Sequence, residues 1–419
     1  MTEEAYSTSD SAPPPANGSR LFICDPACAL PYGHTVSALN HFRKSFSGRF
    51  ASTECVSSLD LPRIVAHAND ITRHFSYLYN EFIPVISAQE EVGVIERHPA
   101  YSPSLADPFE HIAVYDASRF VESRKMSSKD TVLLPGADFY GVAGFVGALG
   151  ALAPQSRPGL LIRLIGVFEH ATKMRSNPER DLLRIIRRGY DLGLRISISA
   201  ETPRYAAKLA DCLEHPVEVT PYPKVSEIIP LPKSTTFNVL CAGSARLDKG
   251  FNHLLGIAKD LLLKPSERPI VITSQTLPVD KSEASDGYTS QLYAAPNVTL
   301  FEPTISEQQM LELYRRCHVV LLPYAKDVYQ FRGSAVMMEA ASYGRLCVTL
   351  RGTAFAQQVE YYGLGSVVDD PGHISDELRR LASEDPIKQG RRIEQARHRY
   401  FANIKSAYER WFNFAVEEA

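Results

Sequence analysis

An excess of positive charge, paired cysteines and long apolar runs are all missing from this sequence. The 419 residues carry 45 Lys and Arg against 48 Asp and Glu, so no basic excess is present to neutralise nucleic-acid phosphates. The seven cysteines are an odd number without paired spacing, which favours buried or half-buried thiols over a disulfide framework or a zinc site. The most apolar later stretch, VAGFVGALGALA, is too short to cross a bilayer.

The amino terminus also lacks the apolar centre of a signal peptide. Residues 1–19 are polar and rich in Pro and Ser, which predicts a disordered tail and a cytoplasmic protein. Peripheral contact with the inner face of a membrane stays open because RDLLRIIRRGYDLGLR combines apolar residues with arginines. The alternative, favoured about two to one, is an ordinary amphipathic helix with solvated arginines.

The alternation of short apolar runs with helical segments predicts an α/β protein with parallel sheets. A strand is expected at residues 20–25 and a helix at 35–46, and TVLLPGAD, LLIRLIGVF, RISISAE and PVEVTPYP are further apolar runs. The pattern stops at TPYPKVSEIIPLPKST, whose four prolines are typical of a linker, and restarts at TFNVLCAGS. Helices are then expected at residues 251–263 and 306–317, in SAVMMEAASYG, and over most of 376–412.

This organisation predicts two doubly wound, Rossmann-like domains that face one another across a cleft. The expected boundaries are a first domain at 20–225, a linker at 226–236 and a second domain at 237–395. A terminal helix at 396–419 could pack back on the first domain. Ligands of such sheets bind at the carboxyl ends of the strands, so the cleft is the expected site.

The stretch CAGSARLDKGFNHLL places two cations where a strand passes into a helix. Gly243 and Ser244 fall at the turn, and Arg246 and Lys249 fall around the expected helix start. Backbone N–H groups and the helix dipole favour phosphate there, and the two side chains could add charge-assisted hydrogen bonds. The alternative is a solvated helix start with incidental charges.

A second segment, RGSAVMMEAASYGRLCV, favours the anion-binding interpretation. Gly333 allows close backbone approach, and Ser334 can cap the helix or bond a ligand oxygen. Glu339 lies in an otherwise small and apolar stretch, where a carboxylate needs partners such as sugar hydroxyls. The alternative is that Glu339 lies at the solvent edge of the helix.

The two segments together resemble the GT-B glycosyltransferases, specifically the large family 4 of nucleotide-sugar-dependent retaining enzymes. AGSARLDKGFNHLL is similar to that family's strand–turn–helix, whose Arg and Lys hold the donor diphosphate, and TISEQQMLELYRRCHVVLLPY is similar to a later helix and strand. RGSAVMMEAASYGRLCV is similar to its donor-binding helix, in which the second glutamate of a Glu-x7-Glu pair contacts the ribose. The resemblance covers roughly residues 236–364, and the amino-terminal half in outline.

One residue departs from the family's pattern. Phe331 stands where the first glutamate of the pair would be, so the resemblance does not indicate which sugar is bound. Arg332 or Tyr329 could replace that glutamate.

In the amino-terminal half, PYGHTVSALNHF resembles the family's Gly-rich loop. Gly33 could approach the donor phosphate, and His34 could bond a sugar or acceptor hydroxyl or simply cap the following helix. Weaker candidates at strand ends are Asp138, Glu169 and His170.

The resemblance implies a hexosyltransferase that moves a sugar from a nucleoside-diphosphate sugar to a hydroxyl with retention, in glycan or glycolipid biosynthesis. No Asp-x-Asp is present, so the expected site needs no metal and no cofactor beside the donor, and Arg246 and Lys249 stabilise the leaving diphosphate. The acceptor could be a glycan, a lipid-linked molecule or a small molecule. The alternatives are a catalytically silent GT-B partner of an active enzyme and a nucleotide-sugar epimerase. A dinucleotide-dependent dehydrogenase is disfavoured because no Gly-x-Gly-x-x-Gly follows the first strand of either half.

Overall fold

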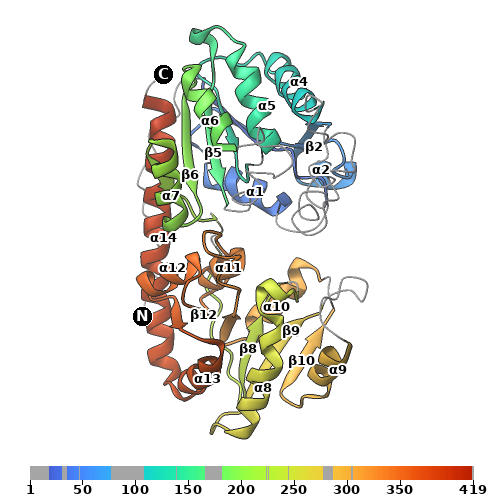
Figure 1. The fold of residues 1–419 in the computed structure, drawn as a ribbon, viewed down its shortest axis with the longest axis vertical. Helices are drawn as coiled ribbons and strands as arrows, with labels where there is room; N and C mark the ends of the chain where they lie inside the picture. Colours follow the sequence, from blue (N-terminus) through green and yellow to red (C-terminus); the bar gives the residue numbers. More distant parts are fainter. Residues whose placement is uncertain are drawn as a thin grey trace, which may run out of the picture. The chain divides into compact units, whose positions relative to one another are not determined.

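The chain forms two compact units of parallel sheet and helix (Figure 1). The computed structural model describes residues 18–30, 35–46, 48–76, 108–137, 139–165, 182–222, 224, 226–243, 245–276, 286–302 and 305–417. The first unit contains Met1–Ser199, Leu209–Glu218 and Glu409–Ala419, and the second contains Ala200–Lys208 and Val219–Tyr408. The predicted linker, residues 226–236, therefore belongs to the second unit.

The first sheet has the strand order β3-β2-β1-β4-β5-β6-β7. Its strands are β1 (Arg20–Asp25), β2 (Ser52–Ser58), β3 (Ile71–Phe75), β4 (Thr131–Leu134), β5 (Gly159–Leu164), β6 (Ile196–Ala200) and β7 (Val217–Val219). The expected strand at 20–25 is confirmed, and β1 pairs in parallel with both β2 and β4. These strands are apolar along most of their length because helices cover both faces of a doubly wound sheet.

The helices of the first sheet are α1 (Thr35–Ser45), α2 (Arg63–Ala68), α4 (Pro108–Ser123), α5 (Phe139–Gly150), α6 (Leu182–Asp191) and α7 (Pro203–Leu213). The stretch VAGFVGALGALA lies mostly in α5, which packs along α4 (Figure 1) and buries nearly all of its side chains. In α6, Leu182, Ile185 and Ile186 are buried, so its apolar side is not available to a membrane surface. The amphipathic-helix interpretation is therefore favoured for this segment.

The second sheet has the strand order β10-β9-β8-β11-β12-β13. Its strands are β8 (Phe237–Cys241), β9 (Ile270–Gln275), β10 (Val298–Phe301), β11 (Val319–Leu322), β12 (Leu346–Leu350) and β13 (Gly365–Val368). Its helices are α8 (Leu254–Leu263), α9 (Asp286–Ala294), α10 (Glu307–Arg316), α11 (Ala335–Tyr343), α12 (Ala354–Tyr362), α13 (Ile374–Ser383) and α14 (Pro386–Glu417). Both sheets have the Rossmann strand order, which confirms the predicted fold class of two doubly wound domains.

The helix after β8 begins later than the sequence predicts. Two short 3₁₀ segments, η4 (Leu247–Lys249) and η5 (Phe251–His253), precede α8, which begins at Leu254 rather than at residue 251. Gly250 separates the two segments in the left-handed conformation at φ 76°, which interrupts a regular helix. The region 376–412 is divided between α13 and α14, because Pro386 disfavours helix at the residue before it.

The predicted linker is bound firmly to the second unit. Arg345 is 1% exposed, and its guanidinium donates to the carbonyls of Ile229 at 2.6 Å and Pro230 at 3.1 Å. The Ile229 N–H donates in turn to the Tyr343 carbonyl at 3.1 Å. The linker therefore runs along the end of α11 with fixed geometry.

All seven cysteines are free thiols, six of them buried and Cys212 half-buried, as the sequence predicts. Across the described ranges, no helix combines the length and hydrophobicity of a bilayer span.

Candidate functional site

The loops after β8 and β11 meet at the point where the strand order of the second sheet reverses. Strands β8 and β11 are adjacent and parallel, and the chain continues from them to opposite sides of the sheet. The Ala325 N–H donates to the Asp248 carbonyl at 2.9 Å, which joins the loops directly. Such a switch point at the carboxyl ends of the strands is where doubly wound sheets bind ligands. We refer to residues 242–250 and 323–334 as the switch loops.

Lys249 occupies the centre of the switch loops. Gly243 has a φ of 95°, and a Cβ placed on it would lie 2.8 Å from the Lys249 Nζ, so the ammonium group rests directly on the glycine. The Nζ also lies 5.9 Å from the ring centre of Tyr324. Burial, reinforced by Arg246 and Arg332, lowers the pKa of Lys249 to about 8. Asp248 opposes this lowering of the pKa, but among the described residues no carboxylate forms an ion pair with the Lys249 Nζ, so this cation can accept an anion from solution.

We expect anion binding at the switch loops to weaken as the pH rises from 7 to 9. Lys249, with a pKa of about 8, is mostly charged at pH 7 and mostly neutral at pH 9. Sulfate keeps its charge over this range, so its affinity at constant ionic strength should fall about tenfold through the loss of the lysine charge. Calorimetric titration measures the change. The variant Lys249→Arg stays charged and should show a flat profile, and a flat wild-type profile would contradict the prediction.

Arg246 forms an ion pair within its own loop. Its Nε and Nη2 donate to the two carboxylate oxygens of Asp248 at 2.9 and 2.6 Å. The Tyr329 hydroxyl lies 3.3 Å from Asp248 Oδ2 and 3.5 Å from Arg246 Nη2. Nη1 forms no hydrogen bond to a described residue, so one edge of the guanidinium remains available to a ligand. Because its hydroxyl lies close to both partners, Tyr329 supports the ion pair between Arg246 and Asp248.

The second switch loop ends at the start of α11. Ser334 is the N-cap, and its hydroxyl accepts from the Met337 N–H at 3.2 Å, so the capping alternative is confirmed for this residue. Arg332 lies over the Tyr329 ring with its guanidinium carbon 5.1 Å from the ring centre. A Cβ on Gly333 would lie 2.2 Å from a carboxylate oxygen of Glu201, which is 8% exposed. The Thr202 hydroxyl donates to the Phe331 carbonyl at 2.7 Å, so residues 201–202 pack against this loop.

Glu339 is buried in α11 rather than located at its solvent edge. Its residue exposure is 8%, and its partners are Lys224 at 2.9 Å and the hydroxyl of Tyr314 at 3.3 Å. The sequence predicts that this carboxylate needs partners, and the protein itself supplies two of them.

The structure brings seven of the predicted site residues to the switch loops: Gly243, Arg246, Lys249, Tyr329, Arg332, Gly333 and Ser334. Glu339 follows in the body of α11. The remaining candidates, Gly33, His34, Asp138, Glu169, His170 and Ser244, lie outside the described residues. Their roles stay predictions.

Four residues contribute to this region without a prediction from the sequence: Glu201, Lys224, Asp248 and Tyr324. Asp248 lies between the two predicted cations, so its charge was visible in the sequence as a potential partner for Arg246. Lys224 lies in the Pro-rich stretch and Glu201 follows β6, and neither has a local signal that points to α11 or its loop.

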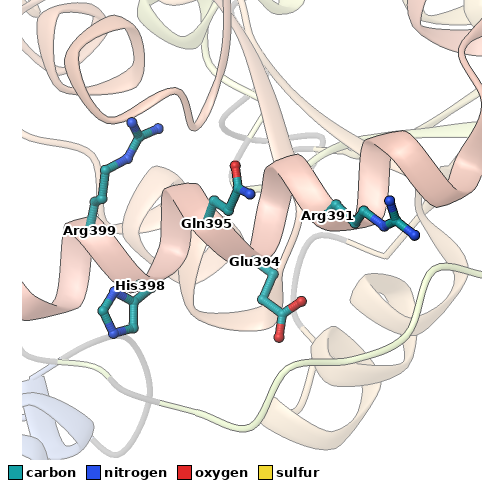
Figure 2. A pocket seen from close by; sticks show the side chains of 5 residues that line it. All are labelled: Arg391, Glu394, Gln395, His398 and Arg399. Atoms are coloured by element: carbon teal, nitrogen blue, oxygen red, sulfur yellow. The ribbon is translucent and has the colours of Figure 1, made fainter.

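A separate hollow of about 490 Å³ lies along α14 (Figure 2). Its described lining residues are Arg391, Glu394, Gln395, His398 and Arg399, all from α14. None of the predicted site residues that the structure describes lines it.

Comparisons with known proteins support the fold through structure alone. No protein-family model and no curated protein matches the sequence. A trehalose-6-phosphate enzyme from E. coli, solved with UDP-2-fluoro glucose, matches with a TM-score of 0.62 and 11% identity over 95% of this chain and 99% of that one.

Two further solved structures match over nearly the whole chain. A trehalose-phosphate synthase from Burkholderia xenovorans in complex with glucose-6-phosphate has a TM-score of 0.61 and 10% identity, covering 94% of this chain and 99% of its own. The lipopolysaccharide outer core galactosyltransferase WaaB has a TM-score of 0.52 and 15% identity, covering 96% and 99%. The chain has the GT-B fold. At these identities the likeness establishes the GT-B architecture, and not the family, donor or acceptor.

Proposed function

We propose that this GT-B protein is a glycosyltransferase that moves a sugar from a nucleoside-diphosphate sugar to an acceptor hydroxyl with retention of configuration. The observation that carries the proposal is the Lys249 ammonium, which rests on Gly243 at the switch point without a carboxylate partner among the described residues. A half-buried cation without an ion-pair partner is suited to an anionic ligand, and a diphosphate is the anion that a nucleotide sugar presents.

The proposed chemistry follows from where charge develops. When the bond from the anomeric carbon to the diphosphate breaks, negative charge grows on the leaving oxygen. Lys249, the free edge of Arg246 and the guanidinium of Arg332 are donors fixed in advance around that position, so they stabilise the transition state without reorganisation. The leaving phosphate itself assists attack of the acceptor on the same face, so the protein needs no nucleophile.

A solved structure supports the choice of donor. One similar GT-B structure was solved with UDP-2-fluoro glucose, and we infer the same class of donor and hexosyl transfer for this chain. The acceptor is not assigned. Gly33 and His34 stay proposed contacts on the acceptor side.

A thermal-shift panel of UDP-, GDP- and ADP-sugars tests the donor. A ligand present at one hundred times its Kd stabilises the folded state by about 2.7 kcal/mol, which corresponds to several degrees in Tm. We expect the nucleotide sugars that carry one particular base to raise the Tm of the protein. The same sugar without the nucleotide should leave the Tm unchanged. A panel in which every nucleotide sugar leaves the Tm unchanged would refute the proposal.

A second candidate is a catalytically silent GT-B partner of an active enzyme. Phe331 in place of the family's first glutamate and the Asp248 carboxylate on Arg246 favour it. Release of free sugar from the donor that the panel identifies discriminates the two, because a slow water-dependent hydrolysis accompanies a competent site. Binding without any hydrolysis or transfer would favour the silent partner.

A further inference from the structure

The ammonium group of Lys249 lies over the aromatic ring of Tyr324. The Lys249 Nζ is 5.9 Å from the ring centre, a distance at which the negative face of an aromatic ring attracts a cation. The second switch loop shows the same arrangement again, because the guanidinium carbon of Arg332 lies 5.1 Å from the ring centre of Tyr329. Two cations of the candidate site are therefore each paired with a tyrosine ring.

Backbone contacts on both sides of Tyr324 hold it opposite the lysine. The Ala325 N–H donates to the Asp248 carbonyl at 2.9 Å. A Cβ placed on Gly250 would lie 2.0 Å from the Pro323 carbonyl oxygen, so these two residues are also in close contact. The neighbours of the tyrosine in the chain thus touch the neighbours of the lysine, and the pairing of β8 with β11 sets this register.

Other aromatic side chains fix the orientation of the ring. Tyr324 is 2% exposed, and its ring centre lies 4.6 Å from that of Tyr329 and 5.5 Å from that of Phe355. Its hydroxyl is buried and forms no hydrogen bond with a described residue. The ring rather than the hydroxyl is therefore the part of this side chain that can act on Lys249.

The surroundings of Lys249 oppose its charge. Burial lowers its pKa, and the charges of Arg246 and Arg332 lower it further. Asp248 and Cys241 act in the opposite direction, and the resulting pKa is about 8. An aromatic face stabilises an ammonium group without a carboxylate that would compete with an anionic ligand for its three N–H donors.

We propose that Tyr324 is a positioning residue whose ring keeps Lys249 charged and in place for the phosphates of the donor. The tyrosine acts through the lysine and does not itself touch the ligand. Its role in donor binding rests on the proposed function, whereas the charge of Lys249 can be measured without any ligand. The inference and the proposed function can therefore fail separately.

Fluorination of the ring tests the attraction with little change of shape. Site-specific replacement of Tyr324 by phenylalanine or by trifluorophenylalanine keeps the ring, but fluorine withdraws electron density and weakens the attraction for a cation. Labelling with a limiting amount of acetic anhydride over a range of pH, read by mass spectrometry, gives the midpoint at which Lys249 loses its proton. This midpoint should be about 8 in the wild type and in Tyr324→Phe. In the trifluorinated protein it should be lower by about 0.5 pH unit or more.

The matched control is the same pair of replacements at Tyr361, an exposed tyrosine on α12, which should leave the midpoint of Lys249 unchanged. The labelling of the exposed Lys259 should be the same in all of these proteins. A purely structural role does not depend on the charge distribution of the ring. Equal midpoints in Tyr324→Phe and the trifluorinated protein, whether at the wild-type value or below it, would therefore overturn the inference.

Sulfate connects the ring to the anion site. Because Lys249 should be less charged in the trifluorinated protein, its affinity for sulfate at about pH 8 should be about two- to threefold lower than that of Tyr324→Phe. Calorimetric titration at constant ionic strength measures the difference. A lower midpoint without any loss of sulfate affinity would overturn the role in donor binding, and would also refute the anion site on which the proposed function depends.

Discussion

Lys249→Met should weaken the binding of the nucleotide-sugar donor by at least about 100-fold and abolish transfer. The variant keeps the length of the side chain over Tyr324 but removes a half-buried cation of the switch loops that forms no ion pair with a described carboxylate. Charge-assisted hydrogen bonds contribute about 1.5–3 kcal/mol each, and a diphosphate can form more than one with an ammonium group. Titration with the donor that the panel identifies measures the loss, and a direct transfer assay measures activity.

The same variant should be more stable than the wild type in the absence of ligand. Folding lowers the pKa of Lys249 from 10.5 to about 8, so the unfolded chain binds this proton more tightly. Wild-type stability therefore rises with pH between about 8 and 10.5, and the charged lysine costs up to about 3 kcal/mol at pH 7. Lys249→Met removes this cost, so its advantage in Tm should be largest at or below pH 7 and shrink toward pH 10.

The control is Lys259→Met, at an exposed lysine on α8 that contacts Gln291 at 3.3 Å. It changes the net charge equally but should alter neither donor affinity nor Tm by more than a small amount. Near-normal donor binding by Lys249→Met would contradict the assignment of Lys249 to the diphosphate. Lower stability of that variant at pH 7 would contradict the cost assigned to its charge.

The second half of the fold was predictable because its signals are local. Each apolar run from TFNVLC to RLCVTL is bounded by turn residues and becomes a strand of the second sheet. The residues SEQQ predict the start of α10, where Ser306 and Gln309 form a capping box. The exception is the start of α8, which the sequence predicts three residues too early. Gly250 prevents a regular helix there because it approaches the backbone of Pro323, and that neighbour is set by the pairing of β8 with β11.

The location of the candidate site was predictable from the sequence, but the ion pairs between its charged side chains were not. The switch point follows from strand order, which places Lys249 and Gly333 on neighbouring loops. Which charges neutralise one another depends on contacts between distant segments. Lys224 reaches Glu339 over 115 positions, and the Glu201 carboxylate reaches Gly333 from the segment after β6. The sequence gives no spacing rule for contacts of this kind.

The pairing also changes the expected role of Arg246. The resemblance implies that its guanidinium holds the diphosphate, but Asp248 occupies two of its donors. A ligand at the switch loops would meet the remaining edge of Arg246 and the whole ammonium group of Lys249. Lys249 should therefore contribute more than Arg246 to the binding of the donor phosphates. The variant Arg246→Met should weaken donor binding less than Lys249→Met does.

Gly250→Ala should destabilise the second unit by about 3 kcal/mol or more. A Cβ on Gly250 would lie 2.0 Å from the Pro323 carbonyl oxygen, and the φ of 76° is itself unfavourable for alanine. Because the obstacle is backbone of the second switch loop, relief requires the two loops to separate. Calorimetry should show a Tm lower by about 6–12 °C for a unit of this size.

The matched control is Gly256→Ala in α8, where a Cβ would meet nothing within 4 Å. Alanine favours helix over glycine by about 0.5–1 kcal/mol, so this variant should keep or slightly raise the Tm. Separation of the loops also moves Lys249 away from Arg332, so Gly250→Ala should lose donor affinity even below its Tm while Gly256→Ala keeps it. An unchanged Tm in Gly250→Ala would show that the loops do not meet at this glycine, and the site built on their contact would have to be abandoned.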